Sequence, residues 1–316
     1  MTQYLVRRLL LAIPTVILVI FMTFLIVRLV RGDIVELILA ERPYADENAR
    51  EDIEKDLGLD KPIPVQFVYY LGDVMRGDLG ESYWTSRPVT EELGNRLPVT
   101  FELGLYAILL GLVIALPIGI LSAVRQDTMS DYGARSFAIL ALSVPYFFTA
   151  TLLIVFPSKW WGWAPPLTYT NFGDDPLDHV YYFFFPALLL AFSLAGSVMR
   201  LTRTMMLEVL RQDYVRTAWA KGLRERSVIT RHCLRNAFIP VITIIGLQVG
   251  VAISGTIILE SIFNMPGVGR YLVGAITQRD YPSVQGVVLV LAVAIVLVNI
   301  LVDMAYAVLD PRIRYS

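Results

Sequence analysis

The chain has 316 residues, 56% of them hydrophobic and 17% charged, with a mean hydropathy of +0.59 and a net charge of −1. Soluble domains carry about 25% charged residues, so this composition excludes an ordinary soluble domain and indicates an integral membrane protein. The single cysteine, Cys233, excludes an intramolecular disulfide and a thiolate metal cluster. The two histidines, His179 and His232, are expected in different loops, which argues against a histidine metal site.

Six apolar runs are long enough to cross a bilayer core, which needs about 20 residues of helix. They cover residues 9–27, 101–124, 137–156, 183–199, 237–259 and 284–307. The apolar core of the first run is too long for a cleaved signal, and no small-x-small site follows it, so we expect it to be retained. The sequence therefore predicts an all-α polytopic membrane protein with six transmembrane helices.

The distribution of charge predicts the orientation. Basic residues concentrate in the segments 1–8, 125–136, 200–236 and 308–316, whereas acidic residues concentrate in 28–99, 157–182 and 260–283. Because Lys and Arg are enriched in cytoplasmic segments, both termini are predicted to be cytoplasmic.

The longest outer segment is predicted to form a small helical extracytoplasmic lobe over residues 31–98. It contains an acidic stretch at 46–60, a candidate helix at 65–75 and a further candidate that opens at Pro88, with glycines and prolines between them. This lobe is either an ordinary packed loop or a docking surface for an extracytoplasmic partner. The chain then divides into an N-terminal helix (1–30), the lobe (31–98) and a five-helix core (99–316).

Two later outer loops carry residues with alternative interpretations. Trp160, Trp161 and Trp163 suit an interfacial aromatic belt, although stacking on a ligand is the other interpretation. The loop after the fifth run is rich in glycine and is expected to need sharp turns or to fold back into the membrane. Its candidate contact residues for an outer partner are Asn264, Pro266, Gly267 and Arg270.

Polar residues in the spans are candidates for a transport pathway or for helix packing. Asn299 and Asp303 lie four residues apart on one face of the last run, and Glu260 ends the fifth. The sequence contains no phosphate-binding loop, no His-Glu-x-x-His, no Gly-x-Ser-x-Gly and no long basic nucleic-acid surface. We therefore expect no catalytic residue, no metal and no cofactor in this chain, and no nucleic-acid partner.

The polar segment 208–240 has an orderly helical pattern. Its residues Val215, Ala218, Trp219, Gly222 and Leu223 have the spacing of one helix face, and Ser227 is positioned to cap a second helix. We expect two short helices joined by a glycine turn at the membrane surface. The nine basic and three acidic residues in 200–236 fit a lipid surface, but the small side chains in this pattern favour docking into a groove on a partner protein.

The same segment resembles the coupling motif of ABC importer permeases. The matching run is Asp213-Tyr214-Val215-Arg216-Thr217-Ala218-Trp219-Ala220-Lys221-Gly222-Leu223, followed by Arg231-His232, Leu234-Arg235-Asn236-Ala237 and Ile239-Pro240. More narrowly, nearly the whole chain is similar to the peptide/nickel permease family. The motifs that carry this wider similarity are Tyr4-Leu5-Val6-Arg7-Arg8-Leu9, Leu57-Gly58-Leu59-Asp60-Lys61-Pro62, Gly77-Asp78-Leu79-Gly80, Arg96-Leu97-Pro98-Val99-Thr100, Phe263-Asn264-Met265-Pro266-Gly267-Val268-Gly269-Arg270, Asp280-Tyr281-Pro282 and Leu309-Asp310-Pro311-Arg312.

Two positions depart from the family pattern. Arg31-Gly32-Asp33-Ile34 stands where the family usually has Pro-Gly-Asp-Pro, and Trp219 occupies a position that is often small or basic. Neither departure affects the coupling motif as a whole. Both leave the identity of the substrate open.

The resemblance implies a type I ABC importer permease fold in a bacterial or archaeal cytoplasmic membrane. It implies a second, similar permease subunit, two ATPase subunits that hold ATP and Mg, and an extracytoplasmic substrate-binding protein, with dipeptides or oligopeptides as cargo. The residues that it assigns to ATPase coupling are Asp213, Tyr214, Arg216, Thr217, Ala218, Trp219, Ala220, Lys221, Gly222, Leu223 and Arg224. The alternatives are a secondary transporter or channel that works without ATPases, and an assembly or scaffold protein that transports nothing.

Overall fold

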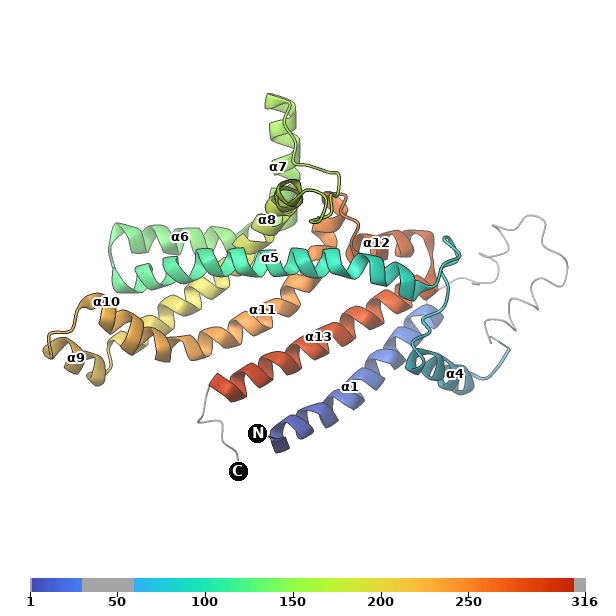
Figure 1. The fold of residues 1–316 in the computed structure, drawn as a ribbon, viewed down its shortest axis with the longest axis horizontal. Coiled ribbons are helices and arrows are strands. Elements are labelled where there is room, and N and C mark those ends of the chain that lie inside the picture. Colours follow the sequence, from blue (N-terminus) through green and yellow to red (C-terminus); the bar gives the residue numbers. More distant parts are fainter. Residues whose placement is uncertain (1, 30–59, 310–316) are drawn as a thin grey trace. The chain divides into compact units, whose positions relative to one another are not determined.

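In a computed structural model, the structure describes residues 2–29 and 60–309, with the side chains of 2–9, 26–29, 303 and 305–309 left aside. The described chain is helical apart from one isolated bridge between Glu81 and Pro88. Its elements (Figure 1) are α1 (Thr2–Leu29), α4 (Ile63–Met75), α5 (Val89–Val124), α6 (Met129–Ser143), α7 (Tyr146–Trp161), α8 (Pro176–Leu210), α9 (Asp213–Ala220), α10 (Glu225–Ser227), the π-helix η1 (Val228–Cys233), α11 (Leu234–Ile262), α12 (Val268–Gln278) and α13 (Tyr281–Leu309).

All six predicted apolar runs fall on these helices. Among the described residues, four stretches are long and apolar enough to cross a membrane: Val89–Val124, Pro176–Leu210, Glu225–Ile262 and Tyr281–Val302. A bent pair, α6 with α7, makes a fifth, and α1 contributes the shorter apolar stretch Leu10–Leu25. The all-α polytopic class is confirmed.

The third predicted run is not one continuous helix. α6 and α7 meet at an angle of 91°. The break falls where Val144 takes an extended conformation (φ −93°, ψ 118°) directly before Pro145. Proline has no N–H to donate and pushes the preceding residue out of the helical region, so the helix stops at Ser143 and restarts at Tyr146. The predicted run 137–156 includes Pro145, and the structure divides this run into two helices at that residue.

The second predicted run begins earlier than expected. The candidate helix that opens at Pro88 and the apolar run 101–124 are one 36-residue helix, α5, with Pro98 inside it. At 1.5 Å per residue, α5 extends well beyond a bilayer core of about 30 Å. The predicted boundary between lobe and core therefore falls within a helix. The candidate helix at 65–75 is confirmed as α4, whereas the acidic stretch 46–60 and the Arg31–Ile34 turn lie outside the described residues, Asp60 excepted.

The chain forms two compact units. One contains Pro98–Arg270 and the end of α13 from Leu297, and the other contains Val6–Leu97 with Tyr271–Val296. In the first unit α8 is the central helix and packs against α6 and α11. Its largest buried cluster includes Leu103, Tyr182, Phe183, Leu190, Leu259 and Phe263. Gly111 and Gly119 of α5 lie close to the backbone of α8, the kind of small-residue contact that lets membrane helices approach closely.

In the second unit, aromatic side chains join the first helix to the lobe. The ring of Phe24 in α1 lies 5.3 Å from that of Phe67 in α4. Gln285 of α13 donates from Nε2 to the carbonyl of Thr23 at 3.1 Å. Gly286 faces Val89, where an added Cβ would lie 2.6 Å from a methyl group. The lobe segment 60–97 is thus a packed structure that α1 and α13 hold in place.

Candidate functional site

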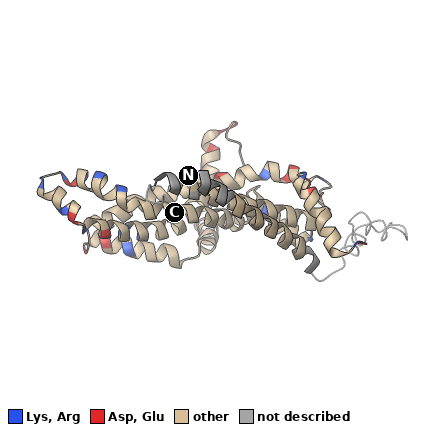
Figure 2. Ribbon diagram, turned by 90° about the horizontal axis from the view of Figure 1, so that it is seen from below, with Lys and Arg blue, Asp and Glu red and all other residues tan. Residues whose placement is uncertain are grey.

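The predicted coupling segment contains a short helix, α9, that follows the end of α8 (Figure 1). Figure 2 shows basic and acidic residues gathered at this end of the unit, whereas the middle stretches of its helices are uncharged. α9 begins after Gln212, which is extended (φ −72°, ψ 147°), and carries Asp213 in its first turn, where a carboxylate stabilises the helix N-terminus. It ends at Ala220, and Gly222 follows with φ +73°. That left-handed conformation is the usual helix end that glycine permits.

The predicted one-sided face of α9 divides between two environments. Val215 and Ala218 are buried and pack against Met206 of α8 and Val228 of η1. Trp219, by contrast, has 44% of its surface exposed. The methyl group of Ala218 is covered by its own chain, so the docking role predicted for α9 is left to its exposed residues and stays a prediction. Every other predicted coupling residue, 213, 214, 216, 217 and 219–224, is exposed.

A polar contact also holds α9 in place. The Tyr214 hydroxyl accepts a hydrogen bond from Asn236 Nδ2 at 2.8 Å and donates to the carbonyl of His232 at 3.4 Å. These groups belong to η1 and to the first turn of α11. The apolar and polar contacts together hold α9 against the C-terminal part of α8 and the start of α11.

The second predicted short helix is absent as a separate element within the described coupling segment. After Gly222, the chain enters a helix at Arg224 and continues through α10 and η1 directly into α11. Ser227 has helical dihedrals (φ −69°, ψ −41°) and caps nothing, so the predicted cap is wrong. The wide π-turn of η1 accommodates an extra residue at this junction, and such turns often occur at functional sites.

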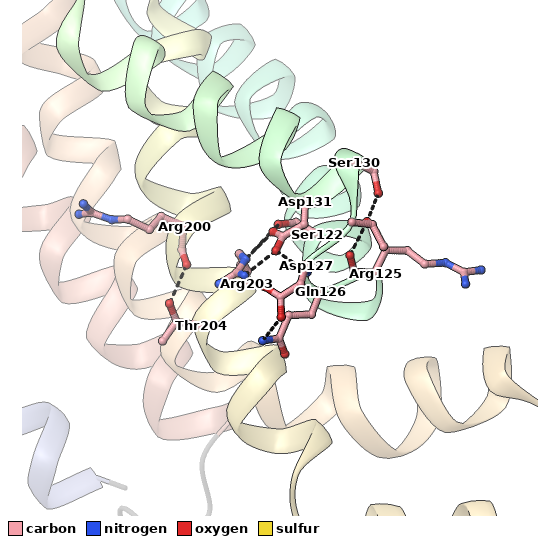
Figure 3. A network of polar contacts seen from close by, with 10 residues as sticks. Ser122, Arg125, Gln126, Asp127, Ser130, Asp131, Arg200, Arg203 and Thr204 are labelled. Carbon is pink, nitrogen blue, oxygen red and sulfur yellow. Dashed lines mark hydrogen bonds and ion pairs between the residues drawn. The ribbon is translucent and has the colours of Figure 1, made fainter.

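A buried ion pair lies where the end of α5, the first turn of α6 and the later part of α8 meet (Figure 3). Asp131 is fully buried, and its two carboxylate oxygens each accept a 2.8 Å hydrogen bond from Arg203. Ser122 Oγ donates to the same carboxylate at 2.5 Å, and the backbone N–H of Asp127 donates at 3.0 Å. Sequence reasoning missed this site, because its partners are 72 positions apart. The only signal was a basic residue within an apolar helix.

In the last turn of α11, Glu260 is completely buried beside the glycine-rich loop. Its carboxylate accepts hydrogen bonds from Thr100 Oγ1 at 2.8 Å and from the backbone N–H of Arg270 at 3.1 Å. A Cβ on Gly267 would lie 2.3 Å from this carboxylate, and one on Gly269 would lie 2.3 Å from the Cα of Ile257. These glycines serve close approach, since neither has a positive φ, whereas the sequence reading had assigned them to sharp turns.

The predicted contact residues of this loop differ in accessibility. Asn264 and Arg270 are exposed, and Arg270 Nη1 donates to the carbonyl of Asn264 at 3.1 Å. Pro266 is half-buried and Gly267 is buried. Asn299 is exposed on α13, and the side chain of Asp303 lies outside the described residues. Their role in a pathway stays a prediction.

His179 is a further buried polar residue, and the prediction that it lies in a loop is wrong. It lies in the first turns of α8, not in a loop, and is 1% exposed. Its Nδ1 contacts the carbonyl of Thr170 at 2.7 Å, and its Nε2 contacts Glu102 Oε1 at 2.7 Å. Since a carbonyl oxygen only accepts, Nδ1 is the donor in the contact with Thr170. The pair fastens the loop before α8 to α5. Among the described residues, no cluster of three or more His, Cys, Asp or Glu has the arrangement of a metal site.

Comparison with known proteins finds similar sequences along the whole chain. Residues 115–315 match the family model "Binding-protein-dependent transport system inner membrane component", and residues 1–104 match the model of its N-terminal region. The dipeptide transport system permease protein DppB of Escherichia coli is 40% identical, with full coverage of both chains. The glutathione transport system permease protein GsiC of Pectobacterium atrosepticum is 41% identical, again over both full lengths.

Solved structures agree on the fold. A chain of the MetNI methionine ABC transporter in an inward-facing form superimposes with a TM-score of 0.57 at 15% identity, covering 72% of this chain and all of that one. A chain of an amino acid ABC transporter gives a TM-score of 0.52 at 14% identity, over 71% and 95%. The fold is thus that of type I ABC importer permeases, and the chain belongs to the family of binding-protein-dependent transport system inner membrane components.

Proposed function

We propose that this chain forms the transport pathway of an ATP-driven importer together with a second permease subunit, and that its cargo is small peptides. The named relatives at 40% and 41% identity are a dipeptide and a glutathione permease. Because glutathione is itself a tripeptide, both names point to short peptides. In this proposal the ATPase sites, with ATP and Mg, lie on two partner chains, and both termini of this chain are cytoplasmic.

The observation that carries the proposal is the construction of α9. It exposes Tyr214, Arg216 and Trp219 outward while Val215 and Ala218 anchor it inward. A helix with one face fixed to its own chain and the other free has what a lever between subunits needs. Force applied to the exposed face passes through the buried one into α8 and α11. The two long helices then supply the element that alternates between two arrangements.

The outer surface is the proposed contact for a substrate-binding protein. Asn264 and Arg270 are exposed on a loop whose base is fixed by the buried Glu260. An exposed tip on a rigid base is well suited to recognise a second protein without rearranging. The exposed Trp160 and Trp161 at the end of α7 suit an interfacial belt.

The decisive experiment is affinity purification of the tagged chain from its native membrane, followed by mass spectrometry of the co-purifying proteins and their stoichiometry. We expect one further permease, two ATPase copies and, on addition of peptide, a binding protein. Reconstituted complex should then hydrolyse ATP faster when a dipeptide-loaded binding protein is added. A chain that purifies alone and moves solute in response to an ion gradient would overturn the proposal in favour of a secondary transporter.

A further inference from the structure

A pocket of about 150 Å³ lies between α6 and α8, beside the buried ion pair. Arg135 of α6 and Arg200 of α8 line it, together with the apolar residues Ala138, Ile139 and Leu142. This volume is well above the roughly 10–15 Å³ that a single water molecule needs. It is large enough for a phosphate group and the atoms next to it, and it combines two positive charges with an apolar wall.

Neither of these two arginines has a carboxylate partner within the described residues, although the Arg135 guanidinium lies 5.7 Å from the centre of the Tyr132 ring. Arg203, which also lines the pocket, is committed to Asp131. The guanidinium of Arg200 turns away from that pair (Figure 3). Both Arg135 and Arg200 are exposed, and within the described part of the chain neither forms an ion pair with a carboxylate. The remaining acidic group nearby, Asp127, is exposed and accepts a hydrogen bond from Gln126.

The positions of these side chains match the layers of a bilayer. Arg135 lies two positions before the apolar run that begins in α6, and Arg200 directly follows the run in α8, on the side of the chain that is rich in basic residues. Ile139 and Leu142 lie four and seven residues further along α6, on the same face as Arg135 and about 6 and 10 Å deeper. Both are exposed, by 64% and 43%. The pocket therefore runs from the head-group level into the acyl-chain level.

We propose that this pocket binds an anionic phospholipid of the cytoplasmic leaflet. Its phosphate would lie between Arg135 and Arg200, and the start of an acyl chain would lie along Ile139 and Leu142. Basic pockets between transmembrane helices on the cytoplasmic side have the charge and depth that such head groups need. A bound lipid would fasten α6 to α8 at the level of the Asp131–Arg203 pair. This site is separate from the coupling surface of α9, so its failure would leave the proposed transport function untouched.

The test uses the assembled transporter, reconstituted in phosphatidylcholine bilayers with or without phosphatidylglycerol and cardiolipin, and native mass spectrometry to count retained lipids. The double variant Arg135→Gln with Arg200→Gln should retain the anionic lipid about 30-fold less, since each basic residue near an anionic surface contributes about fivefold. The matched control Arg125→Gln with Arg211→Gln removes the same charge from exposed residues outside the pocket. It should retain the lipid as the unaltered chain does.

A second variant separates the pocket from charge alone. Ala134 lines the pocket, and Ala134→Leu fills it while keeping both arginines. It should lose the lipid, whereas Ala134→Ser should keep it. If the two double variants lost the lipid equally, or if Ala134→Leu retained it fully, surface charge alone would explain the binding and the proposal would be overturned. Displacement of the lipid by millimolar inorganic phosphate would overturn it in favour of a free-anion site. The proposal would also be overturned if the intact, fully assembled transporter retained no anionic lipid at all.

Discussion

The hydroxyl of Thr100 joins two segments that are far apart in the chain. Its Oγ1 donates to Glu260 Oε1 at 2.8 Å, across 160 positions, and accepts the backbone N–H of Val268 at 2.9 Å. The side chains of Thr100 and Glu260 are buried, with 1% and 0% of their surface exposed. One threonine thus connects α5, the end of α11 and the start of α12, the two helices that flank the loop that we propose as a contact for the binding protein.

Replacing this hydroxyl should destabilise the first unit. Thr100→Val keeps the shape of the side chain but leaves the Val268 N–H without its acceptor and removes one of the donors to Glu260. We expect a loss of about 2 kcal/mol in the free energy of unfolding, measured in mixed micelles, because an unsatisfied buried polar group costs about 1–3 kcal/mol. The control is Thr277→Val, whose hydroxyl bonds only to Val273 within its own helix at an exposed site. Equal stability of the two variants would contradict this role of Thr100.

Gly269 should not tolerate a side chain. A Cβ there would lie 2.3 Å from the Cα of Ile257, and backbone cannot move aside as a flexible side chain does. Gly269→Ala should destabilise the protein by about 1–3 kcal/mol through overpacking and should weaken the response to the binding protein. Gly274→Ala is the matched control, since no atom lies within 4 Å of its added Cβ. A Gly269→Ala protein as stable as this control would show that the loop approaches α11 less closely.

Tyr83 should titrate at unusually high pH. Burial, and then the negative charge of Asp280, raise its pKa from 10.0 to about 12. The folded state therefore holds the phenol proton more tightly than the unfolded state. The resulting stabilisation is present below pH 10 and is lost as the pH rises from 10 to 12. The difference in tyrosinate absorbance between wild type and Tyr83→Phe should show a midpoint near 12.

The contribution of Asp280 to this pKa can be tested separately. Its carboxylate accepts hydrogen bonds from Ser82 Oγ at 2.6 Å and from the Tyr83 N–H at 3.2 Å. In Asp280→Asn the negative charge is gone, so the midpoint of Tyr83 should move down toward 10. A midpoint near 10 in the unaltered protein would mean that the lobe leaves Tyr83 open to water.

The Asp131–Arg203 pair should show strong coupling between its members. Arg203→Met leaves a fully buried carboxylate without its cation, which should cost about 3–5 kcal/mol. Adding Asp131→Asn removes that charge, so the double variant should be more stable than the single one. Arg125→Met, at an exposed site in the same region, should change stability by less than about 0.5 kcal/mol. A single variant no less stable than the double would mean that water or another cation compensates Asp131.

Features that depend on residues close together in the sequence were predictable, whereas contacts between residues far apart in the sequence were not. The apolar runs and α4 were predictable because helix formation and membrane insertion depend on nearby residues. The turn at Gly222 after α9 was predictable for the same reason, because it depends on the glycine itself. Ser227 was misread because capping depends on backbone dihedrals, and here the chain is already helical at that point.

Long-range partners could not be predicted in this way. Nothing near Asp131 indicates Arg203, and nothing near Thr100 indicates Glu260, since each pair forms only when separate helices pack. The glycines at 267 and 269 were recognised as necessary, but their reason, close approach to Glu260 and Ile257, depends on that packing as well. The same holds for Ala218, whose small size suggested a partner's groove and instead fits its own chain.

Gly222 offers the sharpest test of coupling, because its conformation and its surroundings make different demands. Its φ of +73° disfavours most side chains, yet among the described residues, apart from the two chain neighbours, no atom lies within 4 Å of an added Cβ. Asparagine and aspartate tolerate this conformation better than other residues, so Gly222→Asn should preserve the turn after α9. Gly222→Val, which is β-branched, should distort it.

Transport and assembly should then separate the two roles of Gly222. We expect Gly222→Asp to insert in the membrane and to fold, but to lose peptide-stimulated ATP hydrolysis in the reconstituted complex, since an added charge faces the proposed ATPase groove. If only the turn matters, Gly222→Asn and Gly222→Asp will both retain coupling and only Gly222→Val will lose it. If the groove matters, both polar variants will lose coupling while their thermal stability stays that of the unaltered chain. Normal transport by Gly222→Asp would count strongly against docking at α9.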